Sequence, residues 1–154
     1  MPLVILETRI RAPIDVVFDL ARDPVAHAEQ AAFTGEQVVG PGKTSGLLEA
    51  GDLLTFEGRH LGIRQRLTVK ITAMDAPRSF VDEGVRGAFR RLRHVHEFRV
   101  DGDVTVMRDV IDWTSPFGFL GRIADALFVT RHMRWFVTEK QQRLKRMAES
   151  LPPR

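Results

Sequence analysis

The chain has 154 residues, of which 44% are hydrophobic and 28% charged, and its formal net charge is +3. This length and balance predict one globular domain, residues 1–154, with its own core, and the modest charge does not match nucleic-acid binding. The sequence has no cysteine, no signal-peptide pattern and no apolar run long enough for stable membrane insertion, so disulfides and thiolate metal sites are excluded and a cytoplasmic protein is expected.

The amino-terminal third predicts one strand followed by two short helices. Residues 3–11 alternate loosely between apolar and polar side chains, as a strand does. Pro13 lies where the first turn of a helix tolerates proline, and Pro24 begins a second short helix. Residues 32–39 and 45–50 are further strand candidates.

The middle of the chain predicts antiparallel strands joined by tight turns. Residues 52–61, 64–74 and 79–86 each alternate between apolar and polar side chains. The alternation is clearest in the second of these segments. Its inward-facing side chains are expected to be Leu67, Val69, Ile71 and Ala73.

The most informative segment is a hairpin whose arms are residues 92–98 and 105–113. Between them stands Asp101-Gly102, the dipeptide that two-residue type I′ turns prefer because both loop residues need a positive φ. Side chains directly opposite each other share one face of the sheet. With this loop, the predicted pairs are Phe98 with Thr105, His96 with Met107, His94 with Asp109, and Leu92 with Ile111.

This register places polar residues on the apolar face of the hairpin. His94 and Asp109 are expected to form a pair there, beside His96 and Met107. Burying such groups is costly unless they are paired or used. The pair is therefore either a structural hydrogen bond or a polar anchor in a ligand cavity.

The carboxy-terminal part has a different period. Residues 119–149 contain no proline and no glycine after Gly121, and their apolar spacing predicts one long amphipathic helix with a break near residues 130–132. Antiparallel strands joined by tight turns need no crossover helices. The long helix is therefore free to close over one concave face of the sheet.

This order of elements, and several short motifs within it, resemble the SRPBCC superfamily, also called START-like or birch-pollen-allergen-like. The most similar group is that of the bacterial cyclase/dehydrase-like ligand-binding proteins. The motifs are Ala12-Pro13, His60-Leu61-Gly62-Ile63, Ala76-Pro77-Arg78-Ser79-Phe80, Arg86-Gly87-Ala88-Phe89, His94-Val95-His96-Glu97-Phe98, Thr105-Val106-Met107-Arg108-Asp109 and Pro116-Phe117-Gly118. The resemblance implies an α+β helix-grip fold: a curved antiparallel sheet of six to seven strands around a long carboxy-terminal helix, with two short helices after the first strand.

The resemblance also implies a deep apolar cavity between sheet and helix, but no single activity. The leading hypothesis is binding of a small hydrophobic molecule, such as a lipid, an isoprenoid or an aromatic polyketide. One of Asp82 and Glu83 must face inward, because neighbours in a strand alternate, whereas His27 is expected at the surface. The candidate ligand-binding residues are Phe56, His60, Glu83, His94, His96, Phe98, Met107, Asp109, Trp113, Leu127 and Phe128.

Two other functions remain open at this stage. The first is a polyketide cyclase or dehydratase in which His94 and Asp109 act as an acid/base pair. The second is a protein that presents its sheet edge or basic face to a partner or a membrane surface. His94, His96 and Asp109 also have the composition of a metal triad, but spacing alone is a weak signal, so neither a metal nor another cofactor is predicted. The sequence leaves the oligomeric state open.

Overall fold

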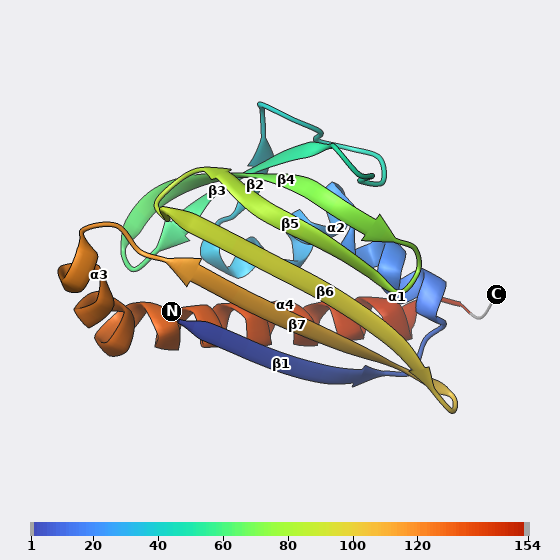
Figure 1. Ribbon diagram of the computed structural model, residues 1–154. Coiled ribbons are helices and arrows are strands. Elements are labelled where there is room, and N and C mark those ends of the chain that lie inside the picture. Colours follow the sequence, from blue (N-terminus) through green and yellow to red (C-terminus); the bar gives the residue numbers. More distant parts are fainter. Residues whose placement is uncertain (1, 153–154) are drawn as a thin grey trace.

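A computed structural model describes residues 2–152, and in it a curved antiparallel sheet wraps around a long helix (Figure 1). The strands are β1 (Leu3–Ile10), β2 (Gln37–Val39), β3 (Leu53–His60), β4 (Ile63–Asp75), β5 (Ser79–Arg86), β6 (Arg91–Asp101) and β7 (Val104–Thr114). They lie in the order β1-β7-β6-β5-β4-β3-β2. The helices are α1 (Ile14–Ala21), α2 (Pro24–Gln30), the 3₁₀ turn η1 (Ala32–Thr34), α3 (Gly118–Ala124), the π turn η2 (Asp125–Val129) and α4 (Thr130–Ser150).

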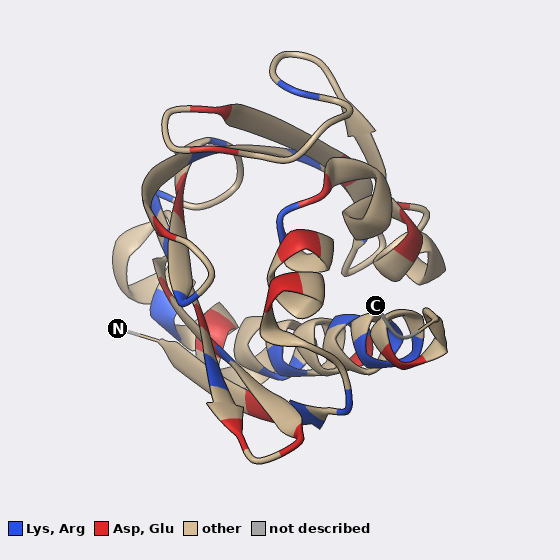
Figure 2. Cartoon of the chain, turned by 90° about the vertical axis from the view of Figure 1, so that its right-hand side faces the viewer, with Lys and Arg blue, Asp and Glu red and all other residues tan. Residues whose placement is uncertain are grey.

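The helix-grip prediction is confirmed, with seven strands in the sheet. Seen from the right-hand side of Figure 1, the sheet curves around the helices (Figure 2). The prediction fails between the second helix and β3. Residues 45–50 form no strand, and residues 32–39 form a 3₁₀ turn and a strand of three residues. Residues 40–46 include three glycines, a proline and a serine, and these residue types favour turns over a sheet ladder.

The predicted alternation along β4 holds only in part. The register shifts between Ile71 and Ala73, which marks an irregularity of the β-bulge type. As a result Ala73 is exposed, contrary to prediction, and Met74 packs on the core instead. Strict alternation with Leu67 and Val69 would place Thr68 on the solvent face, but Thr68 is buried, and its hydroxyl lies 2.8 Å from that of Thr55 on the neighbouring strand.

The β6–β7 turn uses different loop residues from those predicted. Asp101 pairs with Val104, so the loop is Gly102 and Asp103. Gly102 has φ of +63°, and Asp103 is not among the residues with positive φ. A positive φ at the first loop residue alone, with glycine there, is the pattern of a type II′ turn. The expected type I′ turn at Asp101-Gly102 is therefore wrong.

This change moves the register of the hairpin by two residues. His96, and not His94, lies directly opposite Asp109, and His94 lies opposite Ile111. Because the shift is an even number of residues, no side chain changes face. His94 and Asp109 therefore share the inner face, as predicted, but as diagonal neighbours.

The hydrophobic core fills the space between the sheet and the helices near α1. Phe18 of α1 packs edge-on against Phe80 and Phe98, with ring centroids 5.6 and 5.4 Å apart. Met107 and Trp113 of β7 belong to the same buried cluster. Toward α3, the space between sheet and helix holds a cavity whose lining includes Phe117 and Leu120.

The long helix is continuous from α3 through η2 to α4, but its irregular turn lies at η2, before the break predicted near residues 130–132. The buried Asp125 begins this π turn, and its Oδ1 accepts hydrogen bonds from Trp113 Nε1 at 3.1 Å and Ser115 Oγ at 2.5 Å. A π turn holds more residues than an α turn, so it rotates the faces of the helix before and after it. Among the described residues, no helix combines the length and apolarity needed to cross a membrane.

We expect Asp125→Ala to lower the free energy of unfolding by about 2 kcal/mol or more, because the indole N–H and the serine hydroxyl lose their buried acceptor. Asp125→Asn keeps an oxygen acceptor and should cost less. Chemical denaturation measures both values, with Glu29→Ala on the exposed face of α2 as the control. Equal losses for Asp125→Ala and Glu29→Ala would contradict this anchoring role.

Candidate functional site

A cavity of about 400 Å³ lies between the sheet and the long helix. This volume is within the range of small-molecule sites, and most of the lining side chains are apolar. Two groups of polar residues interrupt the apolar lining, and between them they contain all five histidines of the chain. The Asp109 cluster consists of Asp82, His94, His96, Asp109 and Gln141, and the Glu36 cluster consists of His27, Glu36, His60, His132 and Lys140.

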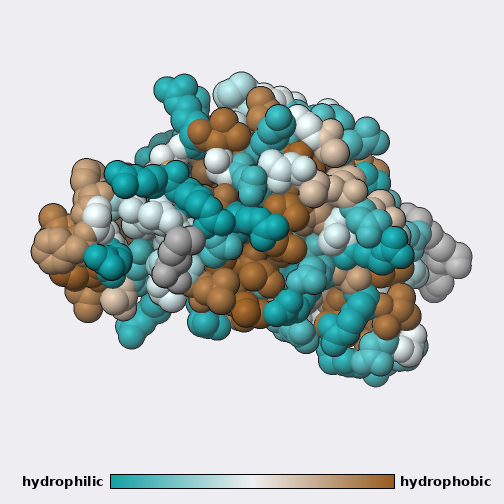
Figure 3. All heavy atoms as spheres, in the orientation of Figure 1, coloured by the Kyte–Doolittle hydropathy of each residue, from teal (hydrophilic) through white to brown (hydrophobic). Residues whose placement is uncertain are grey.

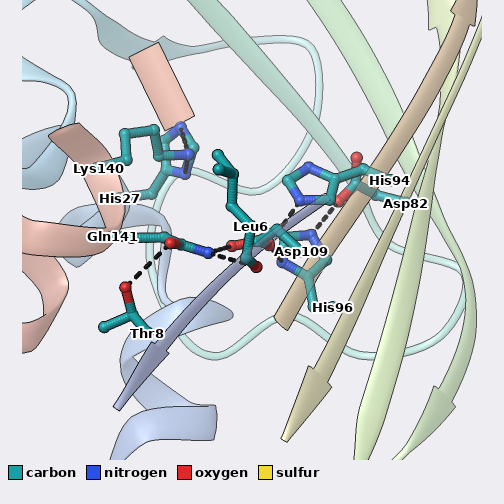
Figure 4. Close-up of polar contacts among 9 residues, drawn as sticks. All are labelled: Leu6, Thr8, His27, Asp82, His94, His96, Asp109, Lys140 and Gln141. Carbon is teal, nitrogen blue, oxygen red and sulfur yellow. Dashed lines mark hydrogen bonds and ion pairs between the residues drawn. The ribbon is translucent and has the colours of Figure 1, made fainter. Parts of the chain in front are cut away.

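The carboxylate of Asp109 is the centre of the first cluster (Figure 4). Its Oδ1 accepts from His94 Nε2 at 2.7 Å and lies 3.1 Å from His96 Nδ1. Its Oδ2 accepts from Gln141 Nε2 of α4 at 2.6 Å. Burial opposes ionisation, but the two histidines hold the pKa of Asp109 well below its ordinary value, so the group stays a carboxylate.

His96 is held between two carboxylates. Its other ring nitrogen, Nε2, lies 2.7 Å from Asp82 Oδ2. Carboxylates only accept, so both ring nitrogens carry a proton and the ring is an imidazolium. Burial alone would lower the pKa of His96, but the hydrogen bonds to Asp109 and Asp82 raise it to about 9. The ring stacks between His94 and Phe80, with centroids 3.7 and 4.1 Å away.

His94 differs from His96 because only one of its nitrogens is used. Nε2 donates to Asp109, and Nδ1 has no hydrogen-bond partner among residues 2–152. Burial and the positive charge of His96 lower the pKa of His94. His94 is therefore a neutral imidazole, oriented by a carboxylate, with a free lone pair on a residue that lines the cavity.

Glu36 is the buried centre of the second cluster. Its two oxygens accept from His27 Nε2 at 3.0 Å and from His60 Nε2 at 3.1 Å. Because burial lowers the pKa of His27 and keeps its ring neutral, its Nδ1 accepts from Lys140 Nζ at 3.0 Å. On the other side of Glu36, His60 Nδ1 lies 2.9 Å from His132 Nε2. Burial opposes ionisation of Glu36, yet the two histidines hold its pKa well below the ordinary value. A continuous hydrogen-bonded chain thus runs from His132 to Lys140.

Lys140 brings an amine into the cavity lining. Besides His27, its Nζ has no hydrogen-bond acceptor among the described residues. Burial lowers the pKa of Lys140, while burial and the lysine charge lower that of His27 to about 4. His27 stacks on Phe56 with centroids 4.2 Å apart, so the prediction that His27 is a surface residue is wrong.

The structure brings part of the predicted site together. Phe56, His60, His94 and His96 line the cavity, and Asp109 lies behind the two histidines of β6. Phe98, Met107 and Trp113 are instead fully packed core residues on the same face.

Three predicted residues point elsewhere. Glu83 lies on the outer face, where it meets Arg93 at 3.5 Å, and its neighbour Asp82 is the inward carboxylate. Leu127 and Phe128 lie within the π turn and are 57% and 60% exposed. Glu36, His132, Lys140 and Gln141 were not among the residues predicted from the sequence.

Asp82, His94 and His96 bring three potential ligand atoms within 4.8 Å of one another, close enough for all three to reach one metal ion. A protonated imidazole cannot bind a metal, so ligation would require His96 to lose a proton that two carboxylates hold. These three residues could therefore bind a metal only if His96 were deprotonated.

We expect His96 to remain protonated at neutral pH, while His94 and His27 are neutral. Because the pKa of His96 is higher in the folded protein than its ordinary value of 6.5, protonated His96 stabilises the fold. This stabilisation is complete below pH 6.5 and is lost as the pH rises through about 9. Histidine ring ¹⁵N spectra should show both His96 nitrogens protonated. Between these pH values the free energy of unfolding should fall more for the wild type than for His96→Gln. A neutral His96 at neutral pH would contradict this and favour the metal alternative.

No family model matches the sequence, and no curated protein matches it. Solved structures do match over nearly the whole chain. The TTHA0849 protein of Thermus thermophilus has a TM-score of 0.79 at 20% identity, covering 97% of this chain and 100% of that one.

Two further structures agree with it. The ginseng major latex-like protein 151 from Panax ginseng has a TM-score of 0.71 at 14% identity, covering 97% of each chain. A START superfamily protein from Mycobacterium smegmatis has a TM-score of 0.73 at 12% identity, covering 97% of this chain and 99% of that one. At these identities the likeness establishes the fold alone. Together with the seven-stranded sheet and the long carboxy-terminal helix, it shows that this chain shares the helix-grip fold of these three proteins.

Proposed function

We propose that the protein binds a small, neutral, largely apolar molecule that carries oxygen atoms, in the cavity between the sheet and the long helix. The observation that carries this proposal is the pair of unfilled hydrogen-bonding groups on cavity-lining residues. Lys140 Nζ offers donors beyond the one that His27 uses, and His94 Nδ1 offers an acceptor. A ligand with a carbonyl and a hydroxyl group would satisfy both, and its carbon skeleton would contact the apolar lining.

The charges around the cavity favour a neutral ligand over an acid. Glu36, Asp82 and Asp109 are carboxylates whose pKa values are all held low. The positive charges against them are the imidazolium of His96 and, when it is protonated, Lys140. Arg66 also lines the cavity, but Glu57 pairs with it at 2.6 Å, so the carboxylates dominate the charge of the two clusters. A further buried carboxylate would meet this negative charge with little water to screen it.

We expect methyl nonyl ketone to bind more tightly than undecanoate, which has the same number of carbon atoms. Lys140→Met should raise the Kd for the ketone about tenfold, because one charge-assisted hydrogen bond is lost. The matched control is Lys145→Met, since Lys145 donates to the Arg9 carbonyl outside the cavity. Isothermal titration calorimetry gives the Kd values, and the Tm of each variant checks its folding.

Tighter binding of undecanoate, or equal Kd values for the two lysine variants, would contradict the proposed polarity of the site. Failure of the wild type to bind either compound would contradict the binding function itself. Native mass spectrometry of the purified protein provides a parallel search for a co-purified apolar molecule.

A second candidate function is a cyclase or dehydratase, and the free Nδ1 of His94 favours it. A neutral imidazole held by Asp109 has the composition of a general base. In such a reaction His94 would remove the proton next to a ketone, and the β-hydroxyl group would leave with that proton as water. Lys140 could donate to the carbonyl oxygen in the same cavity.

If the protein is such an enzyme, an aryl β-hydroxyketone should be converted to the conjugated enone, which absorbs in the ultraviolet. His94→Asn should abolish turnover and leave the Kd for methyl nonyl ketone within about threefold of the wild type. Turnover that persists in His94→Asn would exclude His94 as the base. Absence of turnover in the wild type would leave ligand binding as the function.

A further inference from the structure

The end of the molecule that carries α3 exposes an unusual number of large apolar side chains. Leu61 lies in the β3–β4 turn, and the others lie in the segment from Phe117 to Phe128. We define the apolar rim as Leu61, Phe117, Phe119, Leu120, Leu127 and Phe128, whose exposed fractions run from 50% to 79%. Figure 3 shows brown atoms gathered over this end, at the left of the molecule. Soluble proteins rarely leave so many large apolar residues together at the surface unless they meet a partner.

The apolar rim is continuous with the cavity. Leu61, Phe117 and Leu120 are exposed, and each also lines the cavity. The cavity therefore opens between the β3–β4 turn and α3, and its mouth is surrounded by apolar side chains. A hydrophobic ligand that passes through this mouth leaves or enters across the rim.

The charges next to the rim identify the kind of partner. Between residues 117 and 135 the sequence has three arginines, Arg122, Arg131 and Arg134, and all three are exposed. The one acidic residue of this stretch, Asp125, is buried against Trp113. The surface of this segment thus combines aromatic and aliphatic groups with positive charge alone, which is the combination that binds the interface of an anionic lipid membrane.

We propose that the apolar rim docks on the surface of an anionic lipid bilayer, with the mouth of the cavity facing the membrane. The rim side chains enter the interfacial region, and the three arginines contact the lipid headgroups. This inference rests on the proposed function in one respect only: it implies that the apolar ligand is exchanged with the membrane instead of with water.

Vesicle co-sedimentation tests the proposal on the full chain. The wild type should bind vesicles of phosphatidylcholine mixed with phosphatidylglycerol more strongly than vesicles of phosphatidylcholine alone. Phe119→Ser/Phe128→Ser should weaken binding to both at least about tenfold, because less apolar area is buried. Arg122→Gln and Arg131→Gln should each weaken binding about fivefold, on the anionic vesicles only.

The matched control is Val100→Ser. Val100 is 63% exposed but lies near the β6–β7 turn, at the opposite end of the molecule, so vesicle binding should not change. The Tm of each variant is recorded, and binding of methyl nonyl ketone is measured in the absence of vesicles. The rim variants should keep the ketone affinity of the wild type, which separates membrane docking from ligand binding.

The proposal is overturned if the wild type binds neither kind of vesicle, or if the rim variants bind as the wild type does. It is also overturned if the wild type is a dimer that ignores vesicles and Phe119→Ser/Phe128→Ser makes it a monomer, since the rim then binds a second copy of the chain. If vesicle binding follows the expected pattern but the ketone does not bind, the docking surface stands and the proposed cavity ligand fails.

Discussion

The docking of the long helix on the sheet and the orientation of the site histidines both depend on one buried carboxylate, that of Asp109. A buried charge must be compensated, and its partners come from β6 and α4: His94, His96 and Gln141. Gln141 also donates to the Leu6 carbonyl and accepts from Thr8, so the same side chain ties the long helix to β1. Helix docking and histidine orientation are therefore one network, and disturbing either disturbs the other.

Sequence patterns predicted the sheet, the long helix and the shared face of the two histidines, because these features depend on period alone. The register was harder to predict. Asp101-Gly102 and Gly102-Asp103 both make a two-residue loop, and only the backbone angle at each position distinguishes them. The two registers differ by an even number of residues, so the inner face was predicted correctly and the direct partner of Asp109 was not.

The Glu36 cluster could not be predicted in the same way. Glu36 precedes a strand of three residues and His27 lies in a helix of seven, and neither element is long enough to show a period. One signal was available for the helix. Gln141 stands in a buried stripe with Val137 and Leu144, and a polar residue in such a stripe points to a buried hydrogen bond.

The π turn at Asp125–Val129 rotates the side chains of α3 around the helix axis relative to those of α4. Each residue of an α-helix turns the chain by roughly 100°, so the number of residues in this turn fixes the phase of α3 relative to α4. Removing one residue there would leave the composition nearly unchanged but rotate the aromatic side chains of α3 around the helix axis. An insertion or deletion in this segment should therefore change which side chains α3 exposes more than a single substitution would. Homologous chains that differ in length here should differ in the surface that α3 presents.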